Sequence, residues 1–213
     1  MNIKNWMRLF VHTLFIGGII TVICGFTIQW EQYAPLFRTI DVKEIAAVSS
    51  WLLGVGFIFS VISQMGYFAY LTVHRIGLGF FRSLWNPVQI VIIAFILFDL
   101  VYFRYRGFAE ENESLFPYFS LALFLLAAGM VTAYVKARQT GWHAFVPALF
   151  LMTVVTVVEW FPVLRTNDAD WLFLMLIPLL ICNAYQLLAL PRYIERAREE
   201  RQERLAVNKE TRV

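Results

Sequence analysis

Residues 6–30 read WMRLFVHTLFIGGIITVICGFTIQW, and this stretch decides the fold. It is almost wholly apolar and long enough to cross the ~30 Å hydrocarbon layer as a helix, which takes about 20 residues. Its basic start is typical of a signal peptide, but no small-x-small cleavage pattern follows, and Ile23 rather than a small residue precedes Cys24. We therefore expect it to remain as the first membrane span.

The rest of the chain repeats this pattern. The predicted spans are 6–30, 46–72, 79–103, 115–136, 142–161 and 170–191. Of the 213 residues, 60% are apolar and 15% charged, against about 45–50% and about 25% in soluble domains. A globule of this length could not bury so much apolar surface, which excludes a soluble enzyme, a disordered regulator and a nucleic-acid-binding domain. The sequence predicts an all-α integral membrane protein, with six transmembrane helices over 1–191 and a charged tail over 192–213.

The basic residues predict the orientation. With a cytoplasmic N-terminus, the inside segments carry 13 Lys and Arg and the outside loops carry 5. We therefore expect a multi-pass protein of the cell membrane with both termini cytoplasmic and with loops 31–45, 104–114 and 162–169 outside.

The basic tail, RYIERAREERQERLAVNKETRV, is expected to continue the last helix beyond Pro191. It is either a solvated extension near anionic headgroups or a docking helix for a cytoplasmic partner. Because it has little apolar area to bury, truncation after Pro191 should leave a folded, inserted protein.

Two acids, Asp99 and Glu159, lie inside predicted spans, where a polar side chain is by default a hypothesis about function. Both are expected within a turn or two of the outer surface. There they either snorkel to water or pair with an arginine, or they take a coupling or sensing role. For Glu159 we expect an inward orientation and an ion pair with Arg104, Arg106 or Arg165.

A second polar group is expected in the inner half of the spans: His12, Gln64, Asn86, Gln89, Asn183 and Gln186. Asn86 and Gln89 are three residues apart, as are Asn183 and Gln186, so each pair is expected to share a helix face. Such amides either fix the bundle by bonding across helices or line a polar cavity open to the cytoplasm. Small residues at 17, 21 and 25, and at 129, 133 and 137, favour close packing of helices.

Catalytic motifs are absent from the sequence. It contains no Gly-x-Ser-x-Gly and no His-Glu-x-x-His. The three histidines have no i,i+4 partner and no carboxylate nearby in the sequence, which disfavours a metal or haem site. We expect neither an enzyme nor a bound cofactor or metal.

Several segments have a familiar sequence: GVGFIFSVISQMGYFAYLTVHRIGLGFFRSLWN (54–86), FILFDLVYFRYRGFA (95–109), HAFVPALF (143–150), VVEWFPVLRTND (157–168) and PLLICNAYQLLALP (178–191). They resemble the KbaA family, the KinB-signalling-pathway activation proteins of spore-forming bacilli. The resemblance implies a polytopic membrane regulator that the KinB sensor histidine kinase needs to feed the sporulation phosphorelay. It brings no catalytic or ligand residues.

Two functions therefore stay open. The first is a regulator that contacts a KinB-like membrane kinase within the bilayer and biases its signalling state. The second is a small transporter or channel whose solute affects signalling indirectly, with the inner amides and outer acids as its pathway. An intramembrane enzyme is the least favoured class, because no candidate nucleophile or metal site is present.

Overall fold

The computed structural model describes residues 3–109, 114–166 and 168–210, and these residues contain helices and no strand. The loop residues 110–113, residue 167 and the tail residues 211–213 of the sequence predictions lie outside the described residues. The helices are α1 (Ile3–Ile28), α2 (Trp30–Thr39), α3 (Val42–Phe81), η1 (Arg82–Leu84), α4 (Trp85–Phe108), α5 (Phe116–Thr140), η2 (Trp142–Ala144), α6 (Phe145–Phe150), η3 (Leu151–Val155), α7 (Thr156–Leu164) and α8 (Ala169–Glu210).

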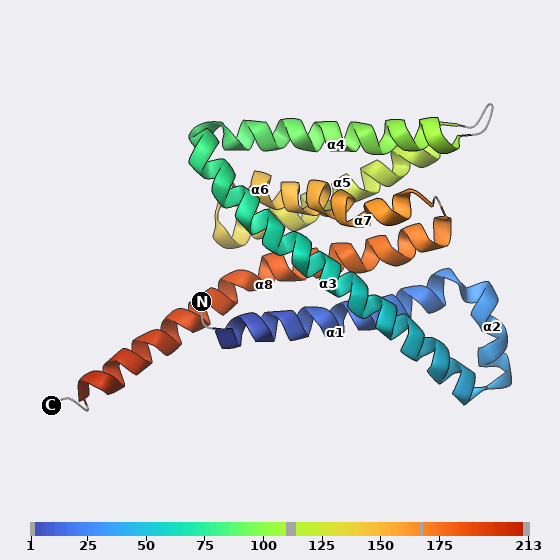
Figure 1. Cartoon of the computed structure of the whole chain (residues 1–213), viewed down its shortest axis with the longest axis horizontal. Coiled ribbons are helices and arrows are strands. Elements are labelled where there is room, and N and C mark those ends of the chain that lie inside the picture. Colours follow the sequence, from blue (N-terminus) through green and yellow to red (C-terminus); the bar gives the residue numbers. More distant parts are fainter. Residues whose placement is uncertain (1–2, 110–113, 167, 211–213) are drawn as a thin grey trace.

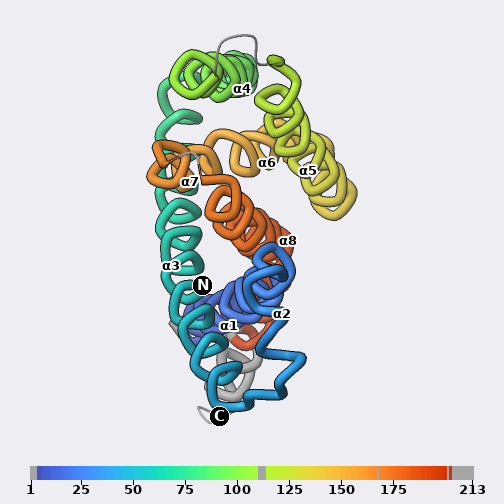
Figure 2. Tube along the Cα trace, turned by 90° about the vertical axis from the view of Figure 1, so that its right-hand side faces the viewer, coloured from blue at the N-terminus to red at the C-terminus, as the bar shows by residue number. Residues whose placement is uncertain are grey.

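The helices stack in layers that α3 connects. Seen end-on, α4 and α5 lie at one edge, α6, α7 and α8 lie in the middle, and α1 and α2 lie at the other edge (Figure 2). The long helix α3 crosses these layers obliquely and packs on α1 and α8 (Figure 1). It is therefore the element that joins the two edges of the bundle.

Five helical stretches among the described residues are long and apolar enough to cross a membrane. One of them, Val42–Phe108, joins α3 and α4 in a single run, but the chain turns at η1, where Arg82 has a φ of 47°, and the two helices form separate rods (Figure 1). Large apolar side chains such as Phe15 and Val91 are more than half exposed, as lipid-facing side chains are. The number of six crossings stays a prediction.

The ends of the helices sort into two groups. In Figure 1, α1 begins and α8 ends on the left, together with the turns at η1 and η2, whereas α2, the end of α7 and the start of α8 lie on the right. This is the grouping that the basic residues predict for the inside and outside segments.

The connections differ from those expected in two places. The stretch 31–45 is not an open loop, because it contains α2, and Asp41 then caps α3 by accepting a hydrogen bond from the Glu44 amide at 3.2 Å. The break between the second and third apolar stretches comes at Arg82 and not between residues 72 and 79. Trp85 fixes this turn, since its Nε1 donates to His74 Nδ1 at 3.0 Å.

The small residues of α1 lie in a packing seam with α3. A Cβ added to Gly56 of α3 would lie 2.7 Å from the Cα of Gly18 of α1, so the two backbones meet at this point. Gly129 and Ala133 of α5 are likewise buried, and Gly129 faces Leu149, Met152 and Thr153. These rows of small residues are internal contacts of the bundle.

A buried lysine repairs a gap in the hydrogen bonds of α8. Pro191 has no N–H, so the carbonyl of Leu187, four residues earlier, lacks its helical donor. Lys136 of α5 is only 8% exposed, and its Nζ donates to this carbonyl at 2.7 Å. The charge pattern predicts Lys136 in an inside connection, as one of the 13 inside cations, whereas α5 continues to Thr140 and buries it. The Leu187 carbonyl thus keeps a donor where α8 runs through Pro191 to Glu210.

Candidate functional site

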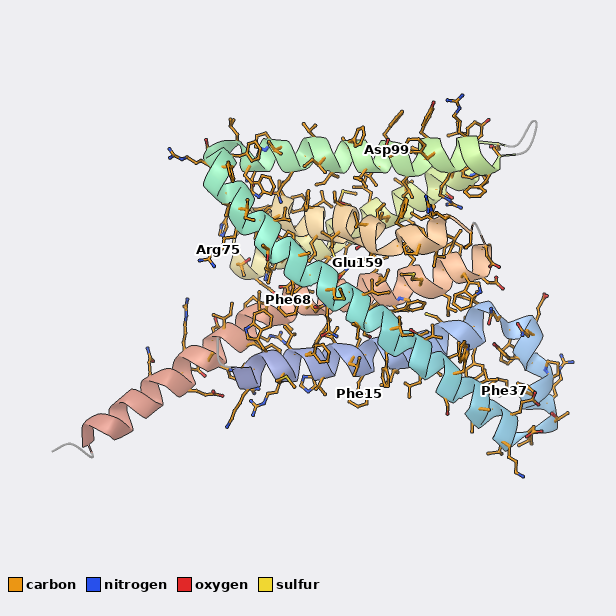
Figure 3. All side chains as sticks on the ribbon, viewed as in Figure 1. Phe15, Phe37, Phe68, Arg75, Asp99 and Glu159 are labelled. Carbon is orange, nitrogen blue, oxygen red and sulfur yellow. The ribbon has the colours of Figure 1, made fainter. Side chains whose placement is uncertain are left out.

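The candidate site is a network of buried polar side chains where α3, α7 and α8 meet, near Glu159 in Figure 3. It begins at η3, a single π-helical segment that precedes α7. Such wide turns change the register of the residues that follow and are frequent at functional sites. Here Thr156 and Glu159, one turn apart on α7, are both buried and both contact Asn183 of α8.

Asn183 is the centre of the network. Its Nδ2 donates to Thr156 Oγ1 at 3.0 Å and to Glu159 Oε2 at 2.7 Å, and its Oδ1 accepts from Ser63 Oγ of α3 at 2.8 Å. Gln186 continues the chain, since its Nε2 donates to Ser63 Oγ at 2.8 Å and to the Cys182 carbonyl at 3.2 Å. All four amide hydrogens are therefore used, and hydrogen bonds run in one direction from Gln186 to the Glu159 carboxylate.

A second, smaller contact lies next to this network. Ser60, one turn before Ser63 on α3, donates to the carbonyls of Thr13 and Gly56, at 3.2 and 2.9 Å. Its Oγ lies 3.8 Å from Cys182 Sγ. These contacts extend the polar seam to α1, so that four helices share it.

Glu159 points inward, as its position in the sequence predicts, and is 6% exposed. The expected ion pair with an arginine is wrong. Within the described chain, Oε2 is held by Asn183 and Oε1 has no hydrogen-bond partner. Arg165 instead lies over the Phe161 ring at 5.2 Å. The physical reason is the orientation of α7. Glu159 lies on the buried face of this helix, so its side chain points toward α3 and α8 and away from the exposed end of α7.

Close backbone packing shapes the wall beside the carboxylate. A Cβ added at Gly66 of α3 would overlap the Glu159 side chain, so no other residue fits here without a shift. Trp160, the next residue of α7, is fully buried and its Nε1 donates to the Leu172 carbonyl at 3.0 Å. The carboxylate is enclosed by α3 at Gly66 and by α8 at Asn183.

The predicted outer acids and inner amides do not form two separate groups. Asn183 and Gln186 share a face as predicted, but that face carries them to Glu159, which was assigned to the other half of the bundle. Asp99, by contrast, is half-buried on α4 (Figure 3) and belongs to a groove between α4 and α7. The two acids therefore occupy different environments.

The remaining amides lie outside the network. Gln64 and Gln89 are buried, and their side-chain atoms have no hydrogen-bond partner within the described residues. Asn86 is exposed, so it does not share the buried environment of Gln89. Residues three apart differ by about 60° around a helix, and here the edge of the buried face passes between them.

Sequence reasoning missed Ser63, Thr156 and Gly66. Hydroxyl groups inside apolar helices are common, and most bond to their own helix, as Thr153 does with the Leu149 carbonyl. A usable signal was the spacing of Ser60, Ser63 and Tyr67, which lie on one face of α3 and are all buried. The partner helix could not be read from this spacing.

These features define an all-helical protein with several apolar helices of membrane-spanning length and a polar network in their interior. A family model described as KinB-signalling pathway activation in sporulation, KbaA, matches residues 17–193. A KinB-signaling pathway activation protein of Bacillus subtilis (strain 168) is 50% identical over 195 residues, which cover 91% of this chain and 98% of that protein. The chain belongs to the KbaA family, which confirms the resemblance. No solved structure matches it.

Proposed function

We propose that this protein is a membrane regulator that activates signalling by a KinB-like sensor histidine kinase into the sporulation phosphorelay, through contact within the bilayer. The description of its family and the name of its Bacillus subtilis relative support the pathway. The observation that carries the mechanism is the hydrogen-bonded chain Gln186–Ser63–Asn183–Glu159, which joins three helices.

The network suits a protein that must hold one helix arrangement. Hydrogen bonds between helices in a membrane are worth about 0.6–2 kcal/mol each, and each one fixes depth and rotation as well as distance. Helix α8 carries Asn183 and Gln186 and continues beyond the bundle to Glu210. A change at the network therefore reaches the part of α8 that projects from the bundle.

The test is a pair of substitutions at Glu159. Glu159→Gln keeps a partner for Asn183 but removes the carboxylate, and Glu159→Leu removes both, so sporulation signalling should fall in the order wild type, Gln, Leu at equal protein level. Glu31, exposed on α2, provides the control Glu31→Leu, which should signal as wild type. Full signalling by Glu159→Leu would contradict a signalling role for the network.

Co-purification with the kinase separates the two open functions. If the protein acts by contact, wild type should co-purify with the kinase from detergent-solubilised membranes, and Glu159→Leu should do so less. Accumulation of a labelled solute in proteoliposomes, without kinase binding, would instead support the transporter.

The proposal includes six crossings with both termini cytoplasmic. Gln202 of α8 and Thr39 of α2 are exposed at opposite ends of the bundle, and the native Cys24 and Cys182 are buried. An impermeant thiol reagent added to intact cells should label Thr39→Cys and not Gln202→Cys. Labelling of Gln202→Cys from outside would reverse the orientation.

The role of the tail can be tested by truncation. The structure indicates a truncation point a few residues later than the sequence did. Tyr193 lies beyond Pro191 but is buried, and its hydroxyl is 2.8 Å from His12 Nδ1 of α1. Truncation after Ile194 should therefore leave a folded, inserted protein, whereas truncation after Pro191 removes this contact. Normal abundance without signalling would identify the tail as the kinase-docking element.

A further inference from the structure

A groove of about 600 Å³ lies between α4 and α7, away from the buried network. Its apolar walls include Leu100 and Phe103 of α4 and Phe161 of α7. Three charged residues also line it, and these are Asp99, Arg104 and Arg165. An apolar channel with both signs of charge is unusual for a surface that faces hydrocarbon, where charged groups are costly.

The opposite charges stand on different walls. Asp99 lies on α4, and Arg165 follows the last residue of α7, its guanidinium folded back over the Phe161 ring at 5.2 Å. Arg104 lies over the Tyr118 ring of α5 at 5.5 Å. Within the described part of the chain, Asp99 and Arg165 form no ion pair with each other or with another side chain. The groove thus offers an anion and a cation that do not neutralise each other.

The walls of the groove face outward. Phe103 is 64% exposed and Phe161 is 53% exposed. In a membrane-spanning bundle these side chains contact acyl chains, so the ligand that reaches the groove most readily is an amphiphile already in the bilayer. It must bring an anion for Arg165, a cation for Asp99 and an apolar chain for the walls.

We propose that this groove binds a zwitterionic glycerophospholipid with a primary ammonium, phosphatidylethanolamine. The phosphate contacts Arg165, the ammonium donates hydrogen bonds to Asp99, and an acyl chain lies along Leu100 and Phe161. A primary ammonium has N–H donors for a carboxylate, whereas the trimethylammonium of phosphatidylcholine has none. Phosphatidylglycerol brings no cation to Asp99. The inference depends on insertion in a bilayer and not on activation of a kinase.

Lipid retention by the full-length protein tests this. The protein is reconstituted in vesicles with equal amounts of phosphatidylethanolamine, phosphatidylcholine and phosphatidylglycerol, extracted in mild detergent, and analysed by native mass spectrometry. One charge-assisted hydrogen bond should favour phosphatidylethanolamine by about tenfold over either other lipid. Asp99→Asn should abolish its advantage over phosphatidylglycerol, and Arg165→Gln should lower retention of all three.

Arg106→Gln is the matched control. Arg106 lies on α4 two residues beyond Arg104 but outside the groove, and its Nη1 donates to Tyr102 Oη at 2.9 Å. This variant should retain the three lipids in wild-type proportions. Equal retention of the three lipids by wild type, or a preference for phosphatidylglycerol, would overturn the proposal, and so would an unchanged preference in Asp99→Asn.

A second measurement uses wild type alone, so it does not depend on how the variants fold. A phosphatidylethanolamine with a photoreactive acyl chain should label peptides from α4 and α7 more strongly than peptides from the equally apolar α1. Labelling that is even over the exposed helices would show only general lipid contact and would overturn the site.

Discussion

Glu159 and Asp99 are both acids in apolar helices, yet they lie in opposite surroundings. Glu159 is 6% exposed and one of its oxygens is held by an amide from another helix. Asp99 is half-buried on the wall of a groove and has no ion-pair partner within the described residues. A polar group enclosed by helices needs protein partners, because no solvent or lipid headgroup reaches it. For a polar group that lines a groove, a ligand can supply the partner instead.

The largest effect is expected at Asn183, the centre of the enclosed region. Asn183→Leu leaves Ser63, Thr156 and Glu159 without this partner, at a cost of about 1–3 kcal/mol for each buried group. Thermal unfolding in detergent should show a strong loss of stability. Asn86→Leu, at an exposed amide, should change stability by no more than about 0.5 kcal/mol. Similar effects of the two substitutions would abolish the contrast between enclosed and exposed polar groups.

A smaller effect is expected from the wall beside the carboxylate. Gly66→Ala places a methyl group on Glu159 and should destabilise the protein by about 1–3 kcal/mol. At Gly54, also on α3, an added Cβ meets nothing within 4 Å, so Gly54→Ala should stabilise the helix by about 1 kcal/mol. The opposite signs can be measured in the same unfolding experiment. A stabilising Gly66→Ala would show that Glu159 does not pack as described.

Lys136 sharpens the comparison, since it is a buried charge whose partner is a backbone carbonyl. If Lys136 replaces the donor that Pro191 lacks, Pro191→Ala should stabilise a Lys136→Met variant by about 1 kcal/mol more than it stabilises wild type. A double-mutant cycle of unfolding free energies measures this coupling. Additive effects would mean that the two residues act independently.

The smallest effect is expected at the groove. Asp99→Asn should change the free energy of unfolding in detergent by no more than about 0.5 kcal/mol, because no protein partner is lost. The circular dichroism melting curve is sufficient to test this. A large loss of stability would show that Asp99, like Glu159, has a partner within the protein. The groove would then offer no free anion to a ligand.

The apolar runs were enough to predict the long apolar helices, though not α2, and the resemblance was enough to predict the family. The contacts of the polar residues were harder to predict. Asn183 and Glu159 are 24 residues apart, and their meeting depends on the π-helical segment η3 and on the close approach of α3 at Gly66. Neither feature produces a periodic pattern in the sequence. The charge of Lys136 suggested an exposed position. Its partner, the carbonyl that lacks a donor because of Pro191, can be recognised only when α5 is known to lie beside α8.

The uninterrupted course of α8 has a mechanical consequence. From Tyr193, which still packs on α1, to Glu210 the helix rises by 17 residue steps, which at 1.5 Å per residue is an arm of about 26 Å. If α8 pivots there, a tilt of about 10° moves the far end by about 4–5 Å over this arm length. A change in one hydrogen bond, too small to open the bundle, is thereby amplified into a displacement as large as a side chain, at a distance where another protein could sense it.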